Sequence, residues 1–261
     1  MIPASRILLV GCGKMGGALL DGWRERFSDL HILVADPVSP EADVKNVGDA
    51  VGPFDCVVLA VKPQVMAETL AEIAPLLTPH MLVLSIAAGK TIAFYESHIG
   101  ESQPIVRVMP NTPAAIGCGM SVLCANAHVS AVQKQLATSL MSAVGFAEWI
   151  DDESLMDAVT AVSGSGPAYV FHMIEALAAA GTAAGLPSDL SMTLARQTVI
   201  GSGILAQSMP DTDAATLRQN VTSPGGTTEA ALKILMAEHG LTDLMTRAVD
   251  AATKRGKELA G

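Results

Sequence analysis

Short apolar runs alternate with helical patterns along the first part of the chain. Runs rich in Val, Ile and Leu predict strands, and apolar positions three and four apart predict helices. The predicted strands are residues 6–10, 31–36, 54–61, 81–86 and 104–109, and the predicted helices are residues 14–26, 64–74 and 91–98. Because strands and helices alternate, we expect a parallel sheet with right-handed crossovers.

One connection breaks this alternation. Residues 37–53, PVSPEADVKNVGDAVGP, lie between the second and third predicted strands and contain Pro and Gly with little periodicity. Proline and glycine disfavour a helix interior. We therefore expect the crossover helix of this unit to be stunted or absent.

The pattern changes after about residue 150, where strand signals stop. The predicted helices of this part are residues 168–185, 188–208, 228–238 and 241–260. The acidic cluster Asp151, Asp152 and Glu153 reads as a helix cap and first turn rather than as a metal site. We expect two domains, residues 1–150 and residues 151–261.

Amino-acid composition and net charge argue against some classes of binding partner. Half of the residues are apolar, but only 3% are aromatic, and the net charge is −10. Such a chain lacks an aromatic platform for nucleic acid and repels nucleic acid and anionic membranes. No apolar stretch reaches the length of a membrane span. We therefore expect no nucleic-acid or membrane partner, and the high mean hydropathy of +0.40 suggests apolar surface buried between subunits.

Cysteine usage and the N-terminus bear on the compartment. The four cysteines show no CxxC spacing, and the first residues do not have the pattern of a secretory signal. We expect free thiols and a cytoplasmic location. The six histidines are scattered without metal-ligand spacing, so no metal is expected.

The segment GCGKMG follows the first predicted strand and opens a helix. In this context Gly11 permits a tight turn, Gly13 lets the backbone approach a pyrophosphate, and Gly16 lets the helix pack on the sheet. The helix N-terminus then faces the phosphates. The alternative is a glycine-rich turn without a ligand.

Asp36 ends the second predicted strand, twenty residues after Gly16. An acidic side chain there can accept hydrogen bonds from ribose hydroxyls and repels a 2′-phosphate, which favours NAD over NADP. The alternative is a solvated loop aspartate, and Ser39 and Lys45 could still help to hold a phosphate. The cofactor preference therefore stays open.

Two more segments leave strands at the edge where open parallel sheets bind ligands. AVKPQ (60–64) places Lys62 there, with an ordinary surface lysine as the alternative. RVMPNTP (107–113) holds Asn111 and Thr112 between two prolines in a stiff loop, with a purely structural turn as the rival.

Two segments of the second half put small residues and Pro ahead of helices. SGSGPAYVF (163–171) and TSPGGTT (222–228) read as helix starts with free N–H groups that can hold a carboxylate or phosphate. Ordinary capped helix starts are the alternative. Residues 151–261 have seven basic and thirteen acidic side chains, a net charge of −6, so an anion there needs amide donors.

Together, GCGKMG, AVKPQ, RVMPNTP, SGSGPAYVF and TSPGGTT occur in the order that is typical of one family. In these segments, over nearly its whole length, the chain resembles pyrroline-5-carboxylate reductase, the last enzyme of proline biosynthesis. The last three segments are the specific ones, because other nucleotide-binding dehydrogenases share the first.

The resemblance implies an α/β fold, with an N-terminal Rossmann domain of doubly wound parallel sheet and a C-terminal all-α dimerisation domain. It also implies an NADPH- or NADH-dependent oxidoreductase that reduces 1-pyrroline-5-carboxylate to L-proline. The helical domain of the family forms an interlocked homodimer, and dimers often assemble into decamers. The site draws residues from both domains and from two protomers.

The resemblance also implies roles for individual residues. The cofactor-binding residues would be Gly11, Gly13, Lys14, Met15, Gly16, Asp36, Asn46, Ala60, Val61, Lys62, Pro63, Ala87, Ala88, Gly89, Met109, Pro110 and Asn111. The substrate-binding residues would be Ser223, Pro224, Gly225, Gly226, Thr227 and Thr228, and the hydroxyl of Thr228 would reach the ring nitrogen as the catalytic group. A protonated imine is already electrophilic, so no strong general acid is required.

The chain departs from the family in the segment between the second and third strands, which is shorter by roughly a helix. The resemblance matches Asn46, within this shortened loop, to a family Asn that contacts adenosine. Two other functions stay open on the residues alone: reduction of another cyclic imine, and nucleotide sensing without turnover. An intact substrate clamp speaks against the second.

Overall fold

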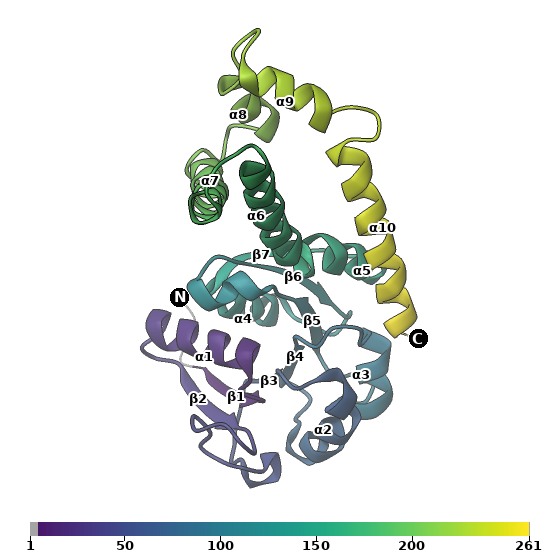
Figure 1. Cartoon of the computed structure of the whole chain (residues 1–261). Helices are drawn as coiled ribbons and strands as arrows, with labels where there is room; N and C mark the ends of the chain where they lie inside the picture. The colour runs from purple at the N-terminus through teal and green to yellow at the C-terminus, as the bar shows by residue number, and fades with distance from the viewer. Residues whose placement is uncertain (1–4, 261) are drawn as a thin grey trace. The chain divides into compact units, whose positions relative to one another are not determined.

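The computed structural model describes residues 5–260. The strands are β1 (Arg6–Val10), β2 (His31–Ala35), β3 (Cys56–Leu59), β4 (Leu82–Ser85), β5 (Ile105–Met109), β6 (Gly119–Ala125) and β7 (Gly145–Trp149). The helices are α1 (Lys14–Arg26), α2 (Met66–Ile73), α3 (Ile92–Ile99), α4 (Ala131–Ser142), α5 (Met156–Val159), α6 (Gly166–Ala183), α7 (Ser188–Ser208), α8 (Ala214–Asn220), α9 (Thr227–Leu235) and α10 (Leu241–Ala260). Figure 1 labels the main elements.

The described strands form one seven-stranded sheet in the order β2-β1-β3-β4-β5-β6-β7. All neighbouring pairs are parallel except β5 and β6. Residues 110–118, which join this pair, are too few for a crossover, which takes about a dozen residues or more. The chain order reverses between β1 and β3, and such a switch point is where open α/β sheets bind ligands.

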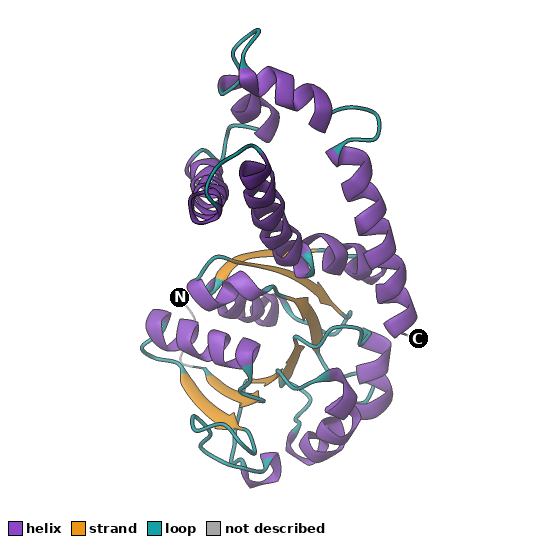
Figure 2. Ribbon diagram, in the orientation of Figure 1, coloured by secondary structure: helices purple, strands orange, loops and turns teal. Residues whose placement is uncertain are grey.

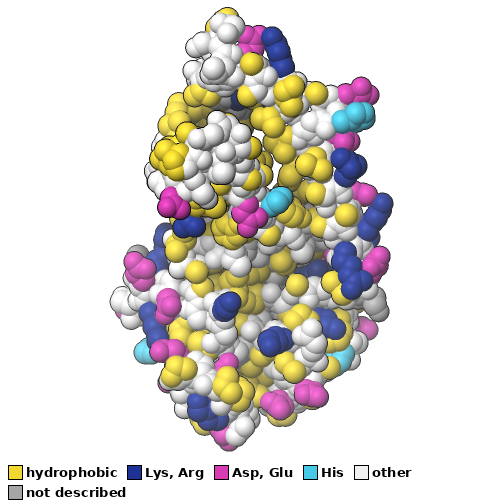
Figure 3. Space-filling model, in the orientation of Figure 1, with side chains coloured by type: hydrophobic (Ala, Val, Ile, Leu, Met, Phe, Trp, Pro, Cys, Tyr) yellow, Lys and Arg dark blue, Asp and Glu magenta, His cyan; other side chains and the backbone are white. Residues whose placement is uncertain are grey.

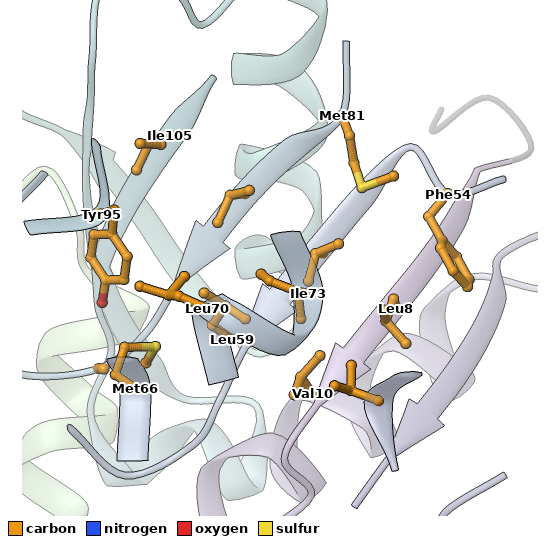
Figure 4. Close-up of a cluster of buried hydrophobic side chains, with 14 of the residues drawn as sticks. Leu8, Val10, Phe54, Leu59, Met66, Leu70, Ile73, Met81, Tyr95 and Ile105 are labelled. Atoms are coloured by element: carbon orange, nitrogen blue, oxygen red, sulfur yellow. The ribbon is translucent and has the colours of Figure 1, made fainter. Parts of the chain in front are cut away.

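Helices cover both faces of the sheet (Figure 1). Alternate residues of β1 serve the two faces: Leu8 and Val10 belong to one buried cluster, and Ile7 and Leu9 belong to the other. Figure 4 shows the first cluster, in which side chains of α2 and α3 meet the strands. Strands buried on both faces explain why the sequence shows continuous apolar runs here.

The five strands predicted for the first 110 residues are all present as β1 to β5. The expectation for the connection between β2 and β3 is also confirmed. Its only helical turn is a 3-10 turn at Val47–Asp49, and an isolated parallel bridge joins Ala35 to Val44.

Sequence analysis missed β6, α4 and α8, and of β7 it recognised only a strand-like character in residues 147–150. The start of α4 carried a readable signal. Ser130 caps the helix, its Oγ accepts from the N–H of Gln133, and the Gln133 side chain accepts from the Ser130 N–H. Ser followed three residues later by Gln is the pattern of a capping box.

The chain divides into two compact units. One runs up to Gly164 and includes the chain from Ala252 onward, and the other is Ser165–Ala251. This division falls inside the helical segment after β7, whereas we predicted a boundary at residue 150 from the end of the strand signals. The domain boundary therefore stays a prediction.

The second unit is helical throughout (Figure 2). Hydrophobic side chains gather on its surface (Figure 3), and several large ones on α6 and α7 are exposed, among them Phe171 and Ile204. In the described range, no helix combines the length and apolar character needed to cross a membrane. The exposed apolar faces are those expected of a subunit interface.

Candidate active site

The glycine loop lies at the switch point between β1 and β3. Gly11 has φ +92°, and a Cβ there would lie 2.8 Å from the carbonyl oxygen of Ala60 and 3.0 Å from Cγ1 of Val61. A Cβ at Gly16 would strike the Gly11 carbonyl oxygen and lie 3.2 Å from the Ala60 side chain. The structure thus packs the loops after β1 and β3 against each other, and only glycine allows this contact.

The start of α1 has open space around it, whereas the Gly11 turn at the end of β1 is tightly packed. Gly13 is the N-cap residue, it is exposed, and a Cβ there would meet nothing within 4 Å. The first intrahelical bond runs from the Gly17 N–H to the Gly13 carbonyl, which leaves the N–H groups of Lys14, Met15 and Gly16 ahead of it. A helix N-terminus of this kind favours an anion.

The carboxylate of Asp36 is turned toward its own chain. The N–H of Cys12 donates to Oδ2 at 2.7 Å, and the N–H groups of Val38 and Ser39 donate to Oδ1 at 2.9 and 2.7 Å. Burial acts to raise the pKa of Asp36, but these hydrogen bonds and the nearby Lys45 charge outweigh it and hold the pKa below its usual value. Asp36 therefore ties the loop after β2 to the glycine loop.

The residues that follow Asp36 are held locally. The Nζ of exposed Lys45 donates to the Ser39 carbonyl at 2.9 Å. Asn46 stands before the short 3-10 turn, and its Nδ2 donates to Oδ2 of Asp49 at 3.2 Å. The structure joins Lys45 to the Asp36 turn, whereas the Asn46 side chain bonds within its own turn.

The loops after β3 and β4 leave the same edge of the sheet. Exposed Lys62 is the residue before the 3-10 turn that begins at Pro63 and leads into α2. In the loop after β4, Ala87 is buried and its N–H donates to the Ser85 hydroxyl at 3.3 Å, while Ala88 is exposed. Gly89 follows with φ +72°, a conformation that favours glycine.

The loop after β5 is fastened on two sides by Asn111. Its Oδ1 accepts from the N–H of Met120 at 2.8 Å, and its Nδ2 donates to the carbonyl of Ser163 at 3.2 Å. Pro110 is buried and Met109 is half-buried. The stiff loop predicted from two prolines is therefore held by side-chain hydrogen bonds as well.

Next to this loop an ion pair, which sequence analysis did not single out, joins buried Arg107 to partly exposed Glu153. Nη1 of Arg107 on β5 is 2.8 Å from Oε1 of Glu153, and the N–H of Ile92 donates to the same oxygen at 2.8 Å. Asp152, beside it, caps the next turn as predicted, with the Ser154 N–H as its donor. Glu153 instead joins β5, the start of α3 and the segment after β7.

The expectation for SGSGPAYVF is wrong in one respect. Residues Thr160–Gly164 already form a π-helical segment, so Ser163 and Gly164 do not form an open helix start. The segment fits the prediction from Gly166 onward, where α6 begins with Pro167 in its first turn. A π-turn has no sequence signature comparable to a cap, which explains the error.

In the helical unit, TSPGGTT lies at the start of α9 as predicted. Gly226 is the N-cap residue, and its N–H donates to the Ser223 carbonyl at 3.0 Å. The N–H of Gly225 donates to the carboxylate of Glu229, whose other oxygen lies 3.3 Å from Lys233 Nζ. Both glycine amides are thus used within the chain.

Helix geometry leaves the N–H groups of Thr227 and Thr228, in the first turn of α9, without intrahelical acceptors. The free donors of this segment are therefore the N–H groups of Thr227 and Thr228, and not those of Gly225 and Gly226. An anion held here would lie against the helix N-terminus.

Comparisons with known proteins match both parts of the chain. Residues 153–259 match the family model described as pyrroline-5-carboxylate reductase dimerisation, and residues 6–89 match the one described as NADP oxidoreductase, coenzyme F420-dependent. A pyrroline-5-carboxylate reductase of Pseudomonas aeruginosa is 43% identical over 98% of this chain and 97% of its own length.

The chain belongs to the pyrroline-5-carboxylate reductase family. A solved structure of a pyrroline-5-carboxylate reductase from Coxiella burnetii matches with a TM-score of 0.92 at 36% identity, over 99% of this chain and 100% of that one. The Plasmodium falciparum enzyme, solved with NADP bound, matches with a TM-score of 0.83 at 31% identity, over 98% of each chain. The family and fold class predicted from the sequence are confirmed, and the chain carries the dimerisation domain of its family.

Proposed function

We propose that the chain reduces 1-pyrroline-5-carboxylate to L-proline, with NADPH or NADH as the reductant. The observation that carries the proposal is the start of α9, where a Pro-Gly-Gly turn leaves the Thr227 and Thr228 amides for an anion. The full-length match to a protein named for this reaction supports it. A small cyclic substrate with one carboxylate suits a site that binds anions through backbone N–H groups.

The glycine loop fits the pyrophosphate of a dinucleotide. Gly13 leaves open space at the start of α1, and the first-turn amides of Lys14, Met15 and Gly16 can donate to phosphate oxygens. Asp36 and Asn46 belong to the adenosine side in this proposal. When bound, the dinucleotide supplies the hydride, and the protein orients the two reactants.

The loops after β3, β4 and β5 would line the nicotinamide. These are Ala60–Val61–Lys62–Pro63, Ala87–Ala88–Gly89 and Met109–Pro110–Asn111, all at the carboxyl edge of the parallel strands. Hydride transfer needs the reacting carbons held about 3–3.5 Å apart. The hydrogen bonds of Asn111 and the φ of Gly89 serve that requirement by fixing the loops.

The segment Ser223–Thr228 would hold the substrate. Its carboxylate would take the N–H groups at the start of α9, and the Thr228 hydroxyl would reach the ring nitrogen. Thr228 then orients the imine and can relay a proton, without an acid of tuned pKa. Glu229 and Lys233 pair with each other, so neither leaves an uncompensated charge beside the bound anion.

The preference between NADPH and NADH depends on the surroundings of Asp36. Its carboxylate is committed to three backbone N–H groups, while Lys45 stands nearby with its amine on the Ser39 carbonyl. A committed carboxylate has less capacity left for ribose hydroxyls, and a lysine can meet a 2′-phosphate. The proposal therefore includes both cofactors, and their measured rates decide between them.

The proposal includes a homodimer as the working unit, formed through the helical domain, and association of dimers into a decamer. It also includes a cytoplasmic location and no partner of nucleic acid or membrane. The exposed apolar faces of α6 and α7 support an association between copies of the chain. Light scattering of the purified protein gives the oligomer number directly.

The first test is turnover. Purified protein mixed with 1-pyrroline-5-carboxylate and either cofactor should oxidise the reduced nicotinamide, seen as loss of its absorbance. No loss with both cofactors would overturn the proposal. Faster turnover of the six-membered cyclic imine would instead assign the chain to that ring size.

The second test separates binding from chemistry. Thr228→Ala should lower kcat by about 10²-fold, the scale of one lost catalytic hydrogen bond, while cofactor affinity stays within twofold. Thr228→Ser keeps the hydroxyl and should recover most of the rate. Equal loss of turnover and of cofactor binding in the Ala variant would mean that Thr228 serves folding.

A further inference from the structure

The π-helical segment Thr160–Gly164 lies between α5 and α6, and so far it has entered the site only through the Ser163 carbonyl that accepts from Asn111. π-helical turns are rare and occur frequently at functional sites. Two of its residues contact the loop after β5, and both contacts lie within the same compact unit. The segment thus meets the loop that we assign to the nicotinamide.

The first contact is steric. A Cβ at Gly164 would lie 2.5 Å from Cε of Met109, well inside van der Waals distance. Glycine at this position therefore gives the Met109 side chain the room that it occupies. Only the tip of a flexible side chain opposes a larger residue, so a substitution displaces Met109 rather than the backbone.

The second contact is a hydrogen bond. Nδ2 of Asn111 donates to the carbonyl of Ser163 at 3.2 Å, one residue before Gly164. Four residues later stands Pro167, which has no N–H, so this carbonyl has no donor at the α-helical spacing. It accepts instead from a side chain of the neighbouring loop.

We propose that Ser163 and Gly164 are positioning residues that set the place of Met109 and Asn111 against the nicotinamide. This inference rests on the proposed function, because it concerns the same reaction. Gly164 acts through Met109 by the space it leaves, and Ser163 acts through Asn111 by its carbonyl. Hydride transfer is sensitive to such placement, since a displacement of about 1 Å can cost about 10²-fold in rate.

The test compares two glycines of the same motif. Gly164→Ala should lower kcat about tenfold and leave KM for the imine within twofold, because ring placement and not substrate binding changes. Gly166→Ala is the matched control, since a Cβ there meets nothing within 4 Å, and its kcat should stay within twofold of the unchanged protein. The midpoint of thermal unfolding should agree among the three proteins within about 3 °C.

A double-mutant cycle isolates the contact. Met109→Leu removes the terminal methyl group that a Cβ at Gly164 would strike, so adding Gly164→Ala in that background should change kcat less than twofold. This comparison can also be made if Gly164→Ala alone does not fold, because the double variant removes the steric overlap between the new Cβ and the Met109 Cε. A further tenfold loss in the Leu background would overturn the inference.

The two proposals fail in different ways. If the unchanged protein does not oxidise either reduced cofactor with 1-pyrroline-5-carboxylate, the proposed function fails. If the unchanged protein is active and Gly164→Ala matches Gly166→Ala in kcat, only the positioning role fails. A rise in KM without a fall in kcat would likewise contradict it.

Discussion

Asp36 shows how a single side chain can tie two loops together through hydrogen bonds to backbone N–H groups. Its two oxygens accept three backbone N–H groups, one of them from Cys12 inside the glycine loop. A carboxylate that accepts several N–H groups is stabilised in its charged form. The charge of Asp36 therefore contributes to the stability of two loops at the switch point.

We predict that Asp36→Asn destabilises the protein by about 1–3 kcal/mol at pH 7, because the amide cannot accept from all three donors and one buried N–H loses its partner. Since folding lowers the pKa of Asp36, its contribution is present above the unfolded value of 3.8 and is lost as pH falls through the folded pKa. Urea unfolding at pH 7 and near pH 3.5 measures both effects.

The difference between the two proteins should therefore shrink on acidification. A difference that stays constant between pH 7 and pH 3.5 would contradict the role of the charge. Glu41→Gln is the control, because this carboxylate is half-exposed in a surface ion pair with Arg24 and should matter little at either pH.

Sequence reasoning succeeded for the glycine loop because spacing fixes it. Gly11 and Gly16 lie where the backbone approaches Ala60 closely, and no other residue fits. The N–H groups of Val38 and Ser39 that bond Asp36 are local and form a turn that an Asp can initiate. The Cys12 N–H that bonds Asp36 and the Ser163 carbonyl that bonds Asn111 lie far along the chain, and such hydrogen bonds leave no pattern in the sequence.

At the scale of elements, one ion pair holds three segments together. Glu153 pairs with Arg107 on β5 and accepts from the first N–H of α3, at Ile92. Arg107 is only 5% exposed, so its charge has little water around it. The loops after β4 and β5 border these two elements, and the pair therefore fixes the frame of the proposed nicotinamide side.

We predict that Glu153→Gln lowers the free energy of unfolding by about 1–3 kcal/mol, because it leaves Arg107 buried without a counter-charge. Glu153 is partly exposed, so the loss stays below that of a fully buried pair. Thermal unfolding of the variant and of Asp152→Asn measures it. Asp152→Asn, at the exposed neighbour, should change the unfolding midpoint little. An equal shift in both variants would contradict the role of the Glu153–Arg107 pair.

Elements with a continuous apolar run or a strong helical period were predicted, and several others were not. The aliphatic strands β1 to β5 stand out because both faces are buried. By contrast, β6 follows a short connection and pairs antiparallel, and the burial of β7 is incomplete along its length. Their apolar signals are weaker, so a sequence pattern alone underestimates the sheet.

For the whole molecule, the decisive feature is apolar surface that the single chain leaves exposed. Ile204 on α7 is 61% exposed, in the segment that matches the dimerisation family. Phe146 on β7 is 67% exposed, but it lies in the sheet-containing unit. Substitutions at these two positions can therefore test whether association depends on the helical unit or on exposed apolar surface in general.

We predict that Ile204→Glu shifts the protein to a smaller oligomer, because association would bury an unpaired charge. Size-exclusion chromatography with light scattering at micromolar concentration measures the mass. Phe146→Glu should keep the mass of the unchanged protein. An Ile204→Glu variant with unchanged mass would place the interface elsewhere.

Backbone recognition at the start of α9 makes the proposed carboxylate site resistant to point mutation. The amides of Thr227 and Thr228 are present whatever side chain stands there, and only proline removes an N–H. An alanine scan would therefore register almost nothing of these donors. Natural substitutions that abolish carboxylate binding should therefore concentrate in the residues that shape the turn before α9. Substitutions at the donor residues themselves should leave carboxylate binding largely unchanged.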